Sequence, residues 1–238
     1  MSKEKAGEVT TKQRLMEAAE ELFANEGFES VSVREITSRA GANVAAVNYH
    51  FGSRTGLVNA VIERYIEPMN QERLRQLTAL ERRGEASVEE IVETFMRPFA
   101  KLVSRSELSE RLFAKLMGRT FGGGVALLPE SVVVSFGELA RRYRKAFGKV
   151  LPGLSDADCY WRLHFMVGAM VHTLAHGDML QKVTGGRCGN PGIDEVLGRC
   201  IRFVAAGIRE GVDAEPAGKR AGKTVKKVAA KPQEEFDF

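Results

Sequence analysis

Apolar residues recur at spacings of three and four along most of the chain, and few stretches alternate with period two. This pattern predicts an all-α protein. The first clear helix runs from about Lys12 to Asn25, with Thr10 or Thr11 as its N-cap and Gly27 at its end. Its apolar face consists of Leu15, Ala18, Ala19, Leu22 and Phe23.

Two short helices are expected next. Ser32 and Glu35 form an S-x-x-E capping box, which predicts a helix over about 33–40 that Gly41 stops. A further helix follows over about 44–51 and ends at a glycine and a serine. A longer helix then begins near Arg54, and we expect Pro68 to disturb or kink it.

The rest of the chain predicts a larger, more apolar helical domain. The expected helices cover residues 88–103, 107–119, 131–149, 156–175 and 194–209, with breaks rich in Gly and Pro between them. The division that follows is a flexible arm over 1–9, a small helical domain over 10–68, a larger one over 69–211 and a tail over 212–238. Between residues 218 and 231 the tail carries six cations and no acid, so we expect it to be disordered.

Composition narrows the class of protein. The chain has 238 residues, of which 44% are hydrophobic and 28% charged, a balance typical of a soluble globular protein. Because no apolar run approaches 18 residues and the first residues are polar, we expect no membrane span, no secretory signal and a cytoplasmic location. Cys159, Cys188 and Cys200 match no zinc or redox motif and are expected to be reduced thiols. The net charge of +4 permits an acidic partner without requiring one.

Two short helices joined by a Gly-containing turn, with a scaffold helix on either side, are typical of a helix-turn-helix, here over about 32–51. The second helix of this motif enters the DNA major groove. Ala45 and Ala46 permit a close approach to DNA, and Tyr49 can bond a phosphate oxygen. Arg34 has the fork that reads guanine, while Arg54 lies at a helix start, where phosphate is favoured.

Three segments carry a family resemblance. A-A-E-E-L-F-A-N-E-G-F at 18–28, S-V-R-E-I-T-S-R-A-G-A at 32–42 and V-N-Y-H-F-G-S-R-T-G-L at 47–57 resemble the DNA-binding domain of TetR-family transcriptional regulators. The resemblance implies an all-α homodimer that binds a near-palindromic double-stranded DNA operator, usually as a repressor released by a small ligand. Arg54 stands where the family usually has Lys, and we expect Arg to serve there as a phosphate donor. The expected DNA contacts are Ser32, Val33, Arg34, Val44, Ala45, Ala46, Asn48, Tyr49, His50 and Arg54.

The resemblance also implies that the last two helices pair with their copies in a four-helix bundle. The residues expected at this dimer interface are Trp161, Phe165, Gly168, Val171, Val204 and Ile208.

Residues 160–175 and the recognition helix resemble a subgroup that includes regulators of fatty-acid degradation, which respond to long-chain fatty acids or their CoA thioesters. Such a ligand needs an apolar tunnel with a polar or basic mouth. The candidates for the tunnel are Phe95, Phe99, Phe113, Met117, Phe121 and Phe136, and those for the mouth are Arg97, Arg141, Arg142 and Arg144. The alternative is that these aromatics are ordinary core and the arginines a solvated face.

Other chemistry is weakly signalled. His164, His172 and His176 are spaced by multiples of four, with Asp178 just beyond, which is one way to hold a metal, but buried or interfacial histidines are commoner. H-T-L-A-H lacks the Glu of a hydrolytic zinc motif, and the triple glycine at 122–124 precedes no P-loop lysine. We therefore expect no cofactor, no metal and no enzymatic activity.

The sequence thus favours a ligand-responsive DNA-binding regulator. The alternative is a helical carrier or enzyme for lipophilic molecules with a vestigial DNA-binding domain. The presence together of Arg34, Tyr49 and Arg54 favours the regulator, since a retired domain would not need them. The basic tail either keeps the protein soluble or adds attraction to DNA of any sequence.

Overall fold

The structure is a computed structural model that describes residues 10–105, 116, 118–120, 128–175, 177–189 and 191–211. Within these ranges every regular element is a helix, which confirms the all-α prediction. The first helices are α1 (Thr11–Glu26), α2 (Val33–Arg39), α3 (Val44–Phe51) and α4 (Arg54–Arg83). They are followed by α5 (Val88–Arg105), α7 (Glu130–Val150), α8 (Asp156–Ala175), α9 (Gly177–Thr184) and α10 (Ile193–Arg209).

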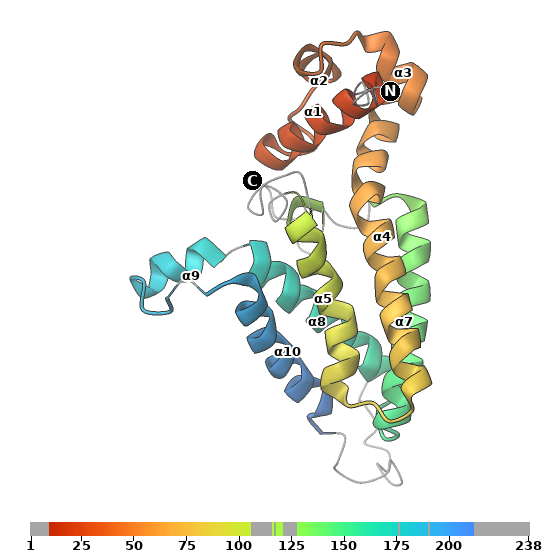
Figure 1. The fold of residues 1–238 in the computed structure, drawn as a ribbon, viewed down its shortest axis with the longest axis vertical. Coiled ribbons are helices and arrows are strands. Elements are labelled where there is room, and N and C mark those ends of the chain that lie inside the picture. The colour runs from red at the N-terminus through yellow and green to blue at the C-terminus, as the bar shows by residue number, and fades with distance from the viewer. Residues whose placement is uncertain are drawn as a thin grey trace, which may run out of the picture.

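The helices form two groups, joined by α4 (Figure 1). Helices α1, α2 and α3 pack on one another, and α1 and α3 also pack on α4, at the top of the figure. We call this group the head. In the second group, α5 packs against α4 and α10, α7 packs on α4, and α8 packs on both α7 and α10. We call this second group the bundle.

Local capping bonds set the helix starts of the head. Thr10 and Gln13 form a reciprocal capping box at α1, and Ser32 and Glu35 form the predicted one at α2. At α3 the side chain of Asn43 accepts a hydrogen bond from the backbone of Ala46. Because each bond joins residues three apart, short sequence windows determine these boundaries.

Helix α4 links the head to the bundle. Its 30 residues correspond to about 45 Å at the usual helical rise. The helix continues through Pro68 as one element, so the expected domain boundary at residue 68 lies inside a helix. Its buried stripe contacts the head through Leu57, Val61 and neighbouring residues and the bundle through Leu77 and Leu80.

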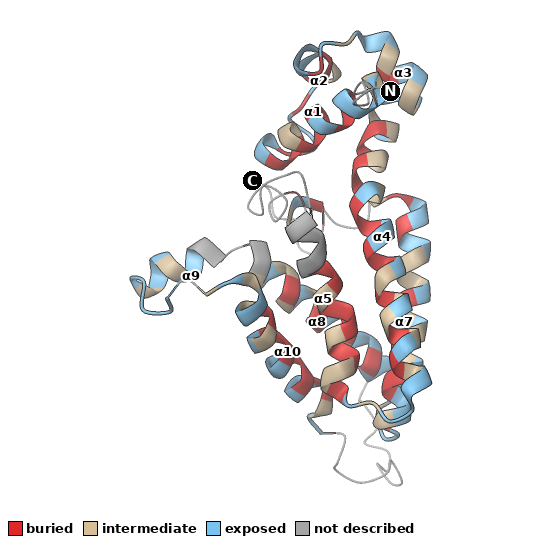
Figure 2. Cartoon of the chain, viewed as in Figure 1, coloured by how far each residue is buried: buried red, intermediate tan, exposed pale blue. Residues whose placement is uncertain are grey.

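The bundle core is built from apolar stripes of helical period. In α5 the buried side chains are Val88, Ile91, Val92, Phe95, Met96 and Phe99. Figure 2 shows buried positions along the facing sides of the bundle helices and mostly exposed ones on α9. The predictions over 88–103, 131–149, 156–175 and 194–209 agree with the structure to within two residues at each end. Most of the expected helix over 107–119 lies outside the described residues, and α9 was not predicted.

None of the described helices is long and apolar enough to cross a membrane. All three cysteines are free thiols, with Cys159 and Cys200 buried and Cys188 exposed.

Candidate functional site

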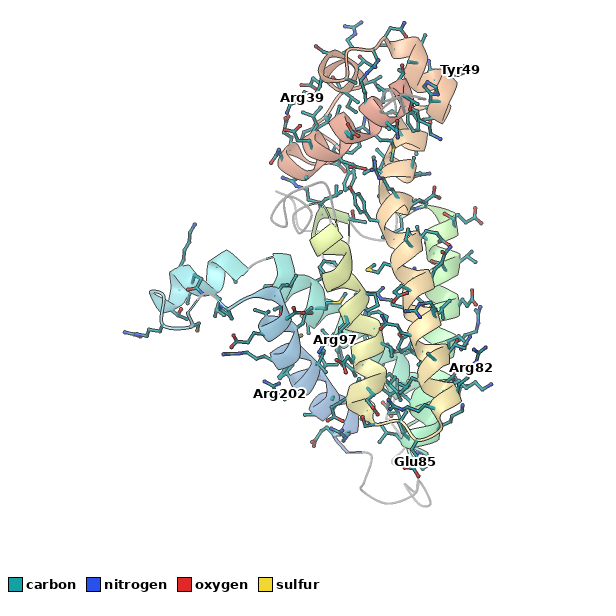
Figure 3. All side chains as sticks on the ribbon, in the orientation of Figure 1. Arg39, Tyr49, Arg82, Glu85, Arg97 and Arg202 are labelled. Atoms are coloured by element: carbon teal, nitrogen blue, oxygen red, sulfur yellow. The ribbon has the colours of Figure 1, made fainter. Side chains whose placement is uncertain are left out.

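The outer face of α3 carries the side chains expected to meet DNA. Val47 is fully buried and anchors the helix, whereas Tyr49 is 85% exposed and points away from the head (Figure 3). We call the exposed side chains of α2 and α3 on this face the recognition surface, which consists of Arg34, Val44, Ala45, Asn48 and Tyr49. The other expected contacts are less free: Val33 and Ala46 pack partly on the core, and Ser32 caps α2.

His50 is half-buried between two aromatic neighbours. Its ring centroid lies 4.9 Å from that of Tyr49 and 6.2 Å from that of Phe51, both in edge-on geometry. These contacts support the base of the Tyr49 side chain and leave its hydroxyl in solvent.

A buried charged group fastens α1 to α4. The carboxylate of Glu20, which is buried, accepts a hydrogen bond from the hydroxyl of Tyr65 at 2.7 Å and pairs with Arg64 at 3.1 Å. Because the buried anion has a counter-charge and a hydrogen-bond donor, it contributes a fixed orientation between the two helices.

Arg54 differs from its expected role. Its Nε donates to the carbonyl of Val31 at 3.1 Å, and its Nη2 donates to the carbonyls of Val31 (3.0 Å) and Phe28. The guanidinium therefore holds the loop between α1 and α2, a role that the sequence did not predict. The planar fork of Arg suits two carbonyls at once, which a Lys at this position would not match.

The bundle encloses a cavity of about 640 Å³, which is in the range of small-molecule sites. Its walls come from α4, α5, α7, α8 and the segment around residue 118, and most of them are apolar. The lining residues are Arg73, Phe95, Gly118, Leu128, Phe136, Leu139, Ala140, Tyr143, Tyr160, Leu163, His164, Val167, Gly168, Met170, Val171 and His172.

Of the predicted ligand contacts that the structure describes, some line the cavity and one lies in the core. Phe95 and Phe136 line the cavity, whereas Phe99 is buried in the core and is not part of its wall. Phe113, Met117 and Phe121 lie outside the described residues.

The four arginines expected at the mouth do not line the cavity either. Three of them make ion pairs at the surface: Arg97 with Glu93 and Asp194, Arg142 with Glu81, and Arg144 with Asp156. Arg141 is exposed and lines a separate surface depression together with Arg142 and Arg144.

Arg73 is a cavity residue that the sequence analysis missed. Its side chain is 1% exposed, and its Nε donates to the carbonyl of Phe95 at 2.8 Å while its Nη1 donates to Oδ1 of Asn70 at 3.1 Å. The guanidinium carbon lies 3.8 Å from the ring centroid of Phe95. Burial lowers the pKa of Arg73 to about 10, so the side chain is still a cation at neutral pH. The sequence signal was a charged residue on the buried stripe of α4, between Met69 and Leu77.

A second polar pair borders the cavity beside Arg73. The hydroxyls of Thr94 and Tyr143 lie 2.9 Å apart, and the Thr94 hydroxyl donates to the carbonyl of Ile91 at 2.7 Å. Because Thr94 has one proton to donate, Tyr143 is the donor within the pair. Burial raises the pKa of Tyr143 to about 12, so it is a neutral phenol at neutral pH.

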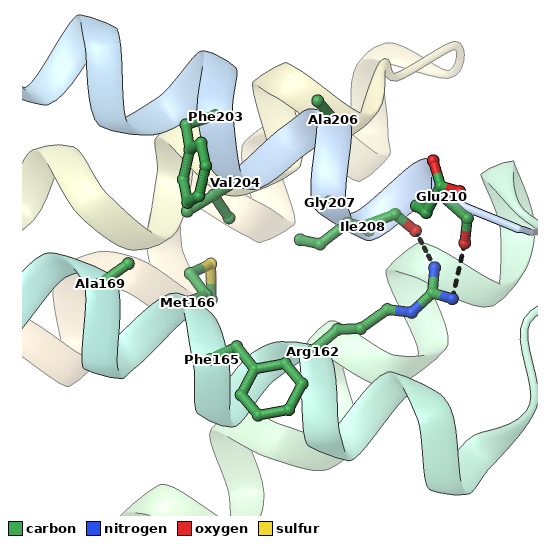
Figure 4. A pocket seen from close by; sticks show the side chains of 10 residues that line it. All are labelled: Arg162, Phe165, Met166, Ala169, Phe203, Val204, Ala206, Gly207, Ile208 and Glu210. Atoms are coloured by element: carbon green, nitrogen blue, oxygen red, sulfur yellow. Dashed lines mark hydrogen bonds between the residues drawn. The ribbon is translucent and has the colours of Figure 1, made fainter.

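Helices α8 and α10 present an apolar face to solvent. Trp161, Phe165 and Phe203 are 60%, 62% and 74% exposed. Phe165 and Phe203 line a groove of about 410 Å³ between the two helices (Figure 4). Arg162 crosses one end of this groove and donates to the carbonyls of Ile208 and, at 2.8 Å, Glu210.

The expected interface residues are only partly on this face. Gly168 is exposed and Val171 half-buried, but Val204 and Ile208 are 7% and 2% exposed and pack inside the bundle of their own chain. Val204 and Ile208 nevertheless line the floor of the groove that Phe165 and Phe203 flank, and the neighbouring Phe203 and Gly207 face outward.

The histidine pattern does not gather into a metal site in the part of the chain that the structure describes. His164 and His172 line the cavity, while His176 lies outside the described residues. Among the described residues, no group of three or more His, Cys, Asp or Glu side chains is placed to hold a metal ion.

Two family models match the chain. One, for bacterial regulatory proteins of the tetR family, covers residues 15–61, and the other, for the tetracyclin repressor-like C-terminal domain, covers residues 93–207. Together these ranges span about two thirds of the chain, and the chain belongs to the TetR family of transcriptional regulators.

Among curated proteins, the chain is similar to the probable HTH-type transcriptional regulator YttP of Bacillus subtilis, with 39% identity over 59 residues, 25% of this chain and 28% of that protein. It is also similar to the HTH-type transcriptional repressor BdcR of Escherichia coli, with 37% identity over 54 residues, 23% and 27% of the two chains. The chain therefore matches about a quarter of the length of these relatives.

Two solved structures share the fold over nearly the whole described chain. A TetR-family regulator from Shewanella sp. PV-4 has a TM-score of 0.58 at 14% identity and covers 83% of this chain and 97% of its own. The fatty acid degradation regulator FadR from Bacillus halodurans has a TM-score of 0.58 at 12% identity, with 87% and 98% covered. At these identities the likeness shows the fold alone. The comparisons support a transcriptional regulator and give no support to the carrier or enzyme alternative.

Proposed function

We propose that this protein is a homodimeric, sequence-specific DNA-binding transcriptional repressor that a small hydrophobic effector releases from its operator. The observation that carries the proposal is the recognition surface. Its side chains are exposed on a short helix whose other face is locked into the head by Val47, and the head lies on the same long helix, α4, that borders the cavity. Helix α4 thus connects the head that carries the recognition helix to the wall of the cavity.

The two kinds of DNA contact are separated on this surface. Arg34 at the start of α2 and Asn48 on α3 have the donors that read base edges, while Tyr49 is placed to bond the phosphate backbone. A dimer of this kind would read two half-sites one helical turn apart, about 34–36 Å.

The exposed face of α8 and α10 supports the dimer. A monomeric protein rarely exposes several large apolar side chains on one continuous surface, and Phe165 and Phe203 flank a groove that a second copy would fill. A Phe165→Glu variant, which places a charge in this surface, should sediment as a monomer in analytical ultracentrifugation. Val183→Glu on α9, also exposed but outside the groove, is the matched control.

The route from cavity to head runs through two contacts. Arg73 of α4 lines the cavity, and so does Gly118, whose neighbour Arg119 donates to the carbonyls of Ala24 (3.2 Å) and Asn25 (2.9 Å) at the end of α1. A ligand that moves these walls would tilt α4 and displace α1, which moves the two heads out of register with successive major grooves. Unchanged operator affinity and head separation at saturating effector would contradict this mechanism.

We propose further that the effector is of the fatty-acid type, either a free acid or an acyl-CoA. The cavity supports this class because its lining is mostly aliphatic and aromatic and its volume fits a small molecule.

The first experiment is fluorescence anisotropy on DNA from upstream of the protein's own gene, against scrambled DNA at two salt concentrations. The full chain and a version ending at Gly211 should bind the upstream DNA with the same preference, since the recognition surface lies in the head. Weak binding that ignores sequence and disappears with the tail would contradict the proposal.

Single-residue variants distinguish contacts to the phosphate backbone from contacts to bases. Tyr49→Ala should weaken binding to all DNA alike, whereas Arg34→Ala should lose about 1–3 kcal/mol of discrimination at one base pair. Arg82→Ala is the matched control, because Arg82 lies at the far end of α4 from the head (Figure 3). Equal loss on every sequence for Arg34→Ala would reassign Arg34 to the phosphate backbone.

A further inference from the structure

Arg73 is a buried cation that has no anionic partner among the described residues. Its partners there are a backbone carbonyl, the amide oxygen of Asn70 and the sulfur of Met170 at 4.0 Å, and none of them carries a negative charge. Among the described residues that line the cavity there is no Asp or Glu. Burying an ion is costly unless a counter-charge or a full set of hydrogen bonds compensates for the lost water.

The hydrogen-bond count of this guanidinium is also incomplete. Arg has five N–H groups, and the described contacts of Arg73 use three, one of them a weak bond to sulfur at the outer limit of distance. One N–H on each terminal nitrogen has no acceptor among the described residues, and one N–H from each terminal nitrogen is a set that can receive a carboxylate in a bidentate arrangement. Because Arg73 borders the cavity, these donors are available to a molecule inside it.

We propose that Arg73 is the anchor for the acid group of the effector, and that the effector is a monocarboxylate with an apolar body held inside the cavity. This inference rests on the effector role proposed for the cavity and specifies its ligand. The ring of Phe95 stacks on one face of the guanidinium and holds it in place, while apolar residues of α7 and α8 surround the body of the ligand.

The same arrangement favours the free acid over its CoA thioester. Arg73 is the one Lys or Arg side chain among the described lining residues, so the cavity offers a single fixed positive charge and none of the several that a CoA head group would require. A carboxylate supplies the missing charge directly.

Calorimetry with matched pairs tests the assignment without a variant. The probes are straight-chain acids from hexanoate to tetradecanoate and 3-phenylpropanoate, each compared with the alcohol of the same skeleton, and decanoyl-CoA. We expect at least one acid to bind about ten- to hundredfold more tightly than its alcohol, as a charge-assisted hydrogen-bonded pair does. If no acid in the series binds more tightly than its alcohol, or if decanoyl-CoA binds more tightly than decanoate, the proposal is wrong.

Two variants then assign the effect to Arg73. Arg73→Met should bring the acid-to-alcohol ratio close to one while the alcohol still binds, and Arg73→Lys, which keeps the charge, should recover part of the ratio. Arg144→Met removes a surface arginine that does not line the cavity and should leave the ratio unchanged. If folded Arg73→Met keeps the wild-type acid-to-alcohol ratio, the assignment is wrong. A loss of this ratio in Arg144→Met would also overturn it.

The outcome is separable from the proposed function. Operator binding is measured on the same protein by anisotropy with and without the acid. If the acid binds but operator affinity does not change, the anion site is confirmed and its effector role is contradicted. If the protein binds its operator but calorimetry shows no preference for any acid over its alcohol, the anion site alone is contradicted.

Discussion

The head and the bundle treat buried charge in opposite ways. In the head, the buried carboxylate of Glu20 has Arg64 as a counter-charge and Tyr65 as a donor, so its charge is compensated within the chain. In the bundle, buried Arg73 has no carboxylate partner among the described residues, and two of its N–H groups have no described acceptor at the wall of a cavity. A buried charge paired within the chain helps to hold a rigid reading module, while a buried charge without a described counter-charge offers a defined place for a ligand.

The two regions also differ in the range of the contacts that build them. The helix starts of the head depend on bonds between residues three apart, such as Ser32 with Glu35 and Asn43 with Ala46. The cavity depends on residues brought together from far along the chain, such as Arg73 and Met170. The head should therefore be sensitive to single backbone changes and the bundle more tolerant.

The largest expected effect is on a glycine of the head. A Cβ at Gly56 would lie 1.9 Å from the carbonyl oxygen of Phe51, which is backbone and cannot rotate away, so Gly56→Ala should cost about 3 kcal/mol of stability. Gly148 of α7 has no atom within 4 Å of the same position, and Gly148→Ala should stabilise the protein by about 0.5–1 kcal/mol.

Urea unfolding followed by circular dichroism measures both variants. Because the clash separates α3 from α4, Gly56→Ala should also lose operator binding, while Gly148→Ala should keep it. If the two variants unfold at the same urea concentration, the head is not more sensitive to a backbone change than the bundle.

These local rules explain what the sequence could predict. The capping box at Ser32, the bounds of α3 and the exposure of Tyr49 all follow from short windows of residues. The burial of Val204 and Ile208 in their own chain does not follow from such a window, because the packing of α10 against α5 and α8 decides which apolar face turns inward. Short α9 lies next to a glycine-rich break that masked its periodicity.

The site residues also divide into those that a short sequence window predicts and those that depend on long-range packing. Arg34 and Tyr49 lie on the surface where their motif puts them, whereas Arg73 as a cavity residue needed the position of α8 to be known. Arg54 was placed correctly at a helix start, but its partners are carbonyls 23 and 26 residues earlier in the chain, which no local pattern shows.

A second prediction separates support from DNA contact at Arg54. Arg54→Ala removes the charged donors to the carbonyls of Phe28 and Val31 and should cost about 2 kcal/mol. Operator affinity should fall with thermal stability, and the dependence of affinity on salt should keep its slope. Arg39→Ala, which breaks an exposed pair with Glu21 in the same head, is the control and should cost less than about 0.5 kcal/mol.

Unchanged stability of Arg54→Ala combined with a salt slope reduced by about one would assign Arg54 to a phosphate. Arg54 would then act by contacting DNA and not by supporting the loop between α1 and α2, which would weaken the view of the head as a self-contained module.

A third prediction concerns the junction between the two regions. Arg119 donates to the last carbonyls of α1, a favourable place for a cation, and Arg119→Ala should cost about 1 kcal/mol. Hydrogen exchange at the C-terminal turn of α1 should become faster while exchange in α10 stays the same. Arg199→Ala, which breaks an exposed pair within α10, should not change exchange in α1, and protection of α1 that persists in Arg119→Ala would remove this junction from the proposed route.

The smallest effect compares the same capping box in the two regions. A hydrogen bond from the backbone N–H of Ser32 lowers the pKa of Glu35 in the head. In the bundle, Glu90 accepts from the backbone N–H of Ser87 and also from Arg83, and together with the Ser87 hydroxyl these bonds lower its pKa to about 2. Each carboxylate therefore stabilises the fold above its ordinary pKa of 4.5, and this contribution is lost as pH falls below 4.5, for Glu90 down to about 2.

Carbon-detected NMR titration of the two carboxyl groups tests the comparison. Glu90 should titrate below Glu35, because Arg83 adds a charged donor that the head box lacks. Arg83→Gln should raise the midpoint of Glu90 and leave that of Glu35 unchanged. If Glu90 titrates at or above Glu35 in the wild-type chain, Arg83 adds nothing to the cap, and the two boxes are equivalent despite their different surroundings.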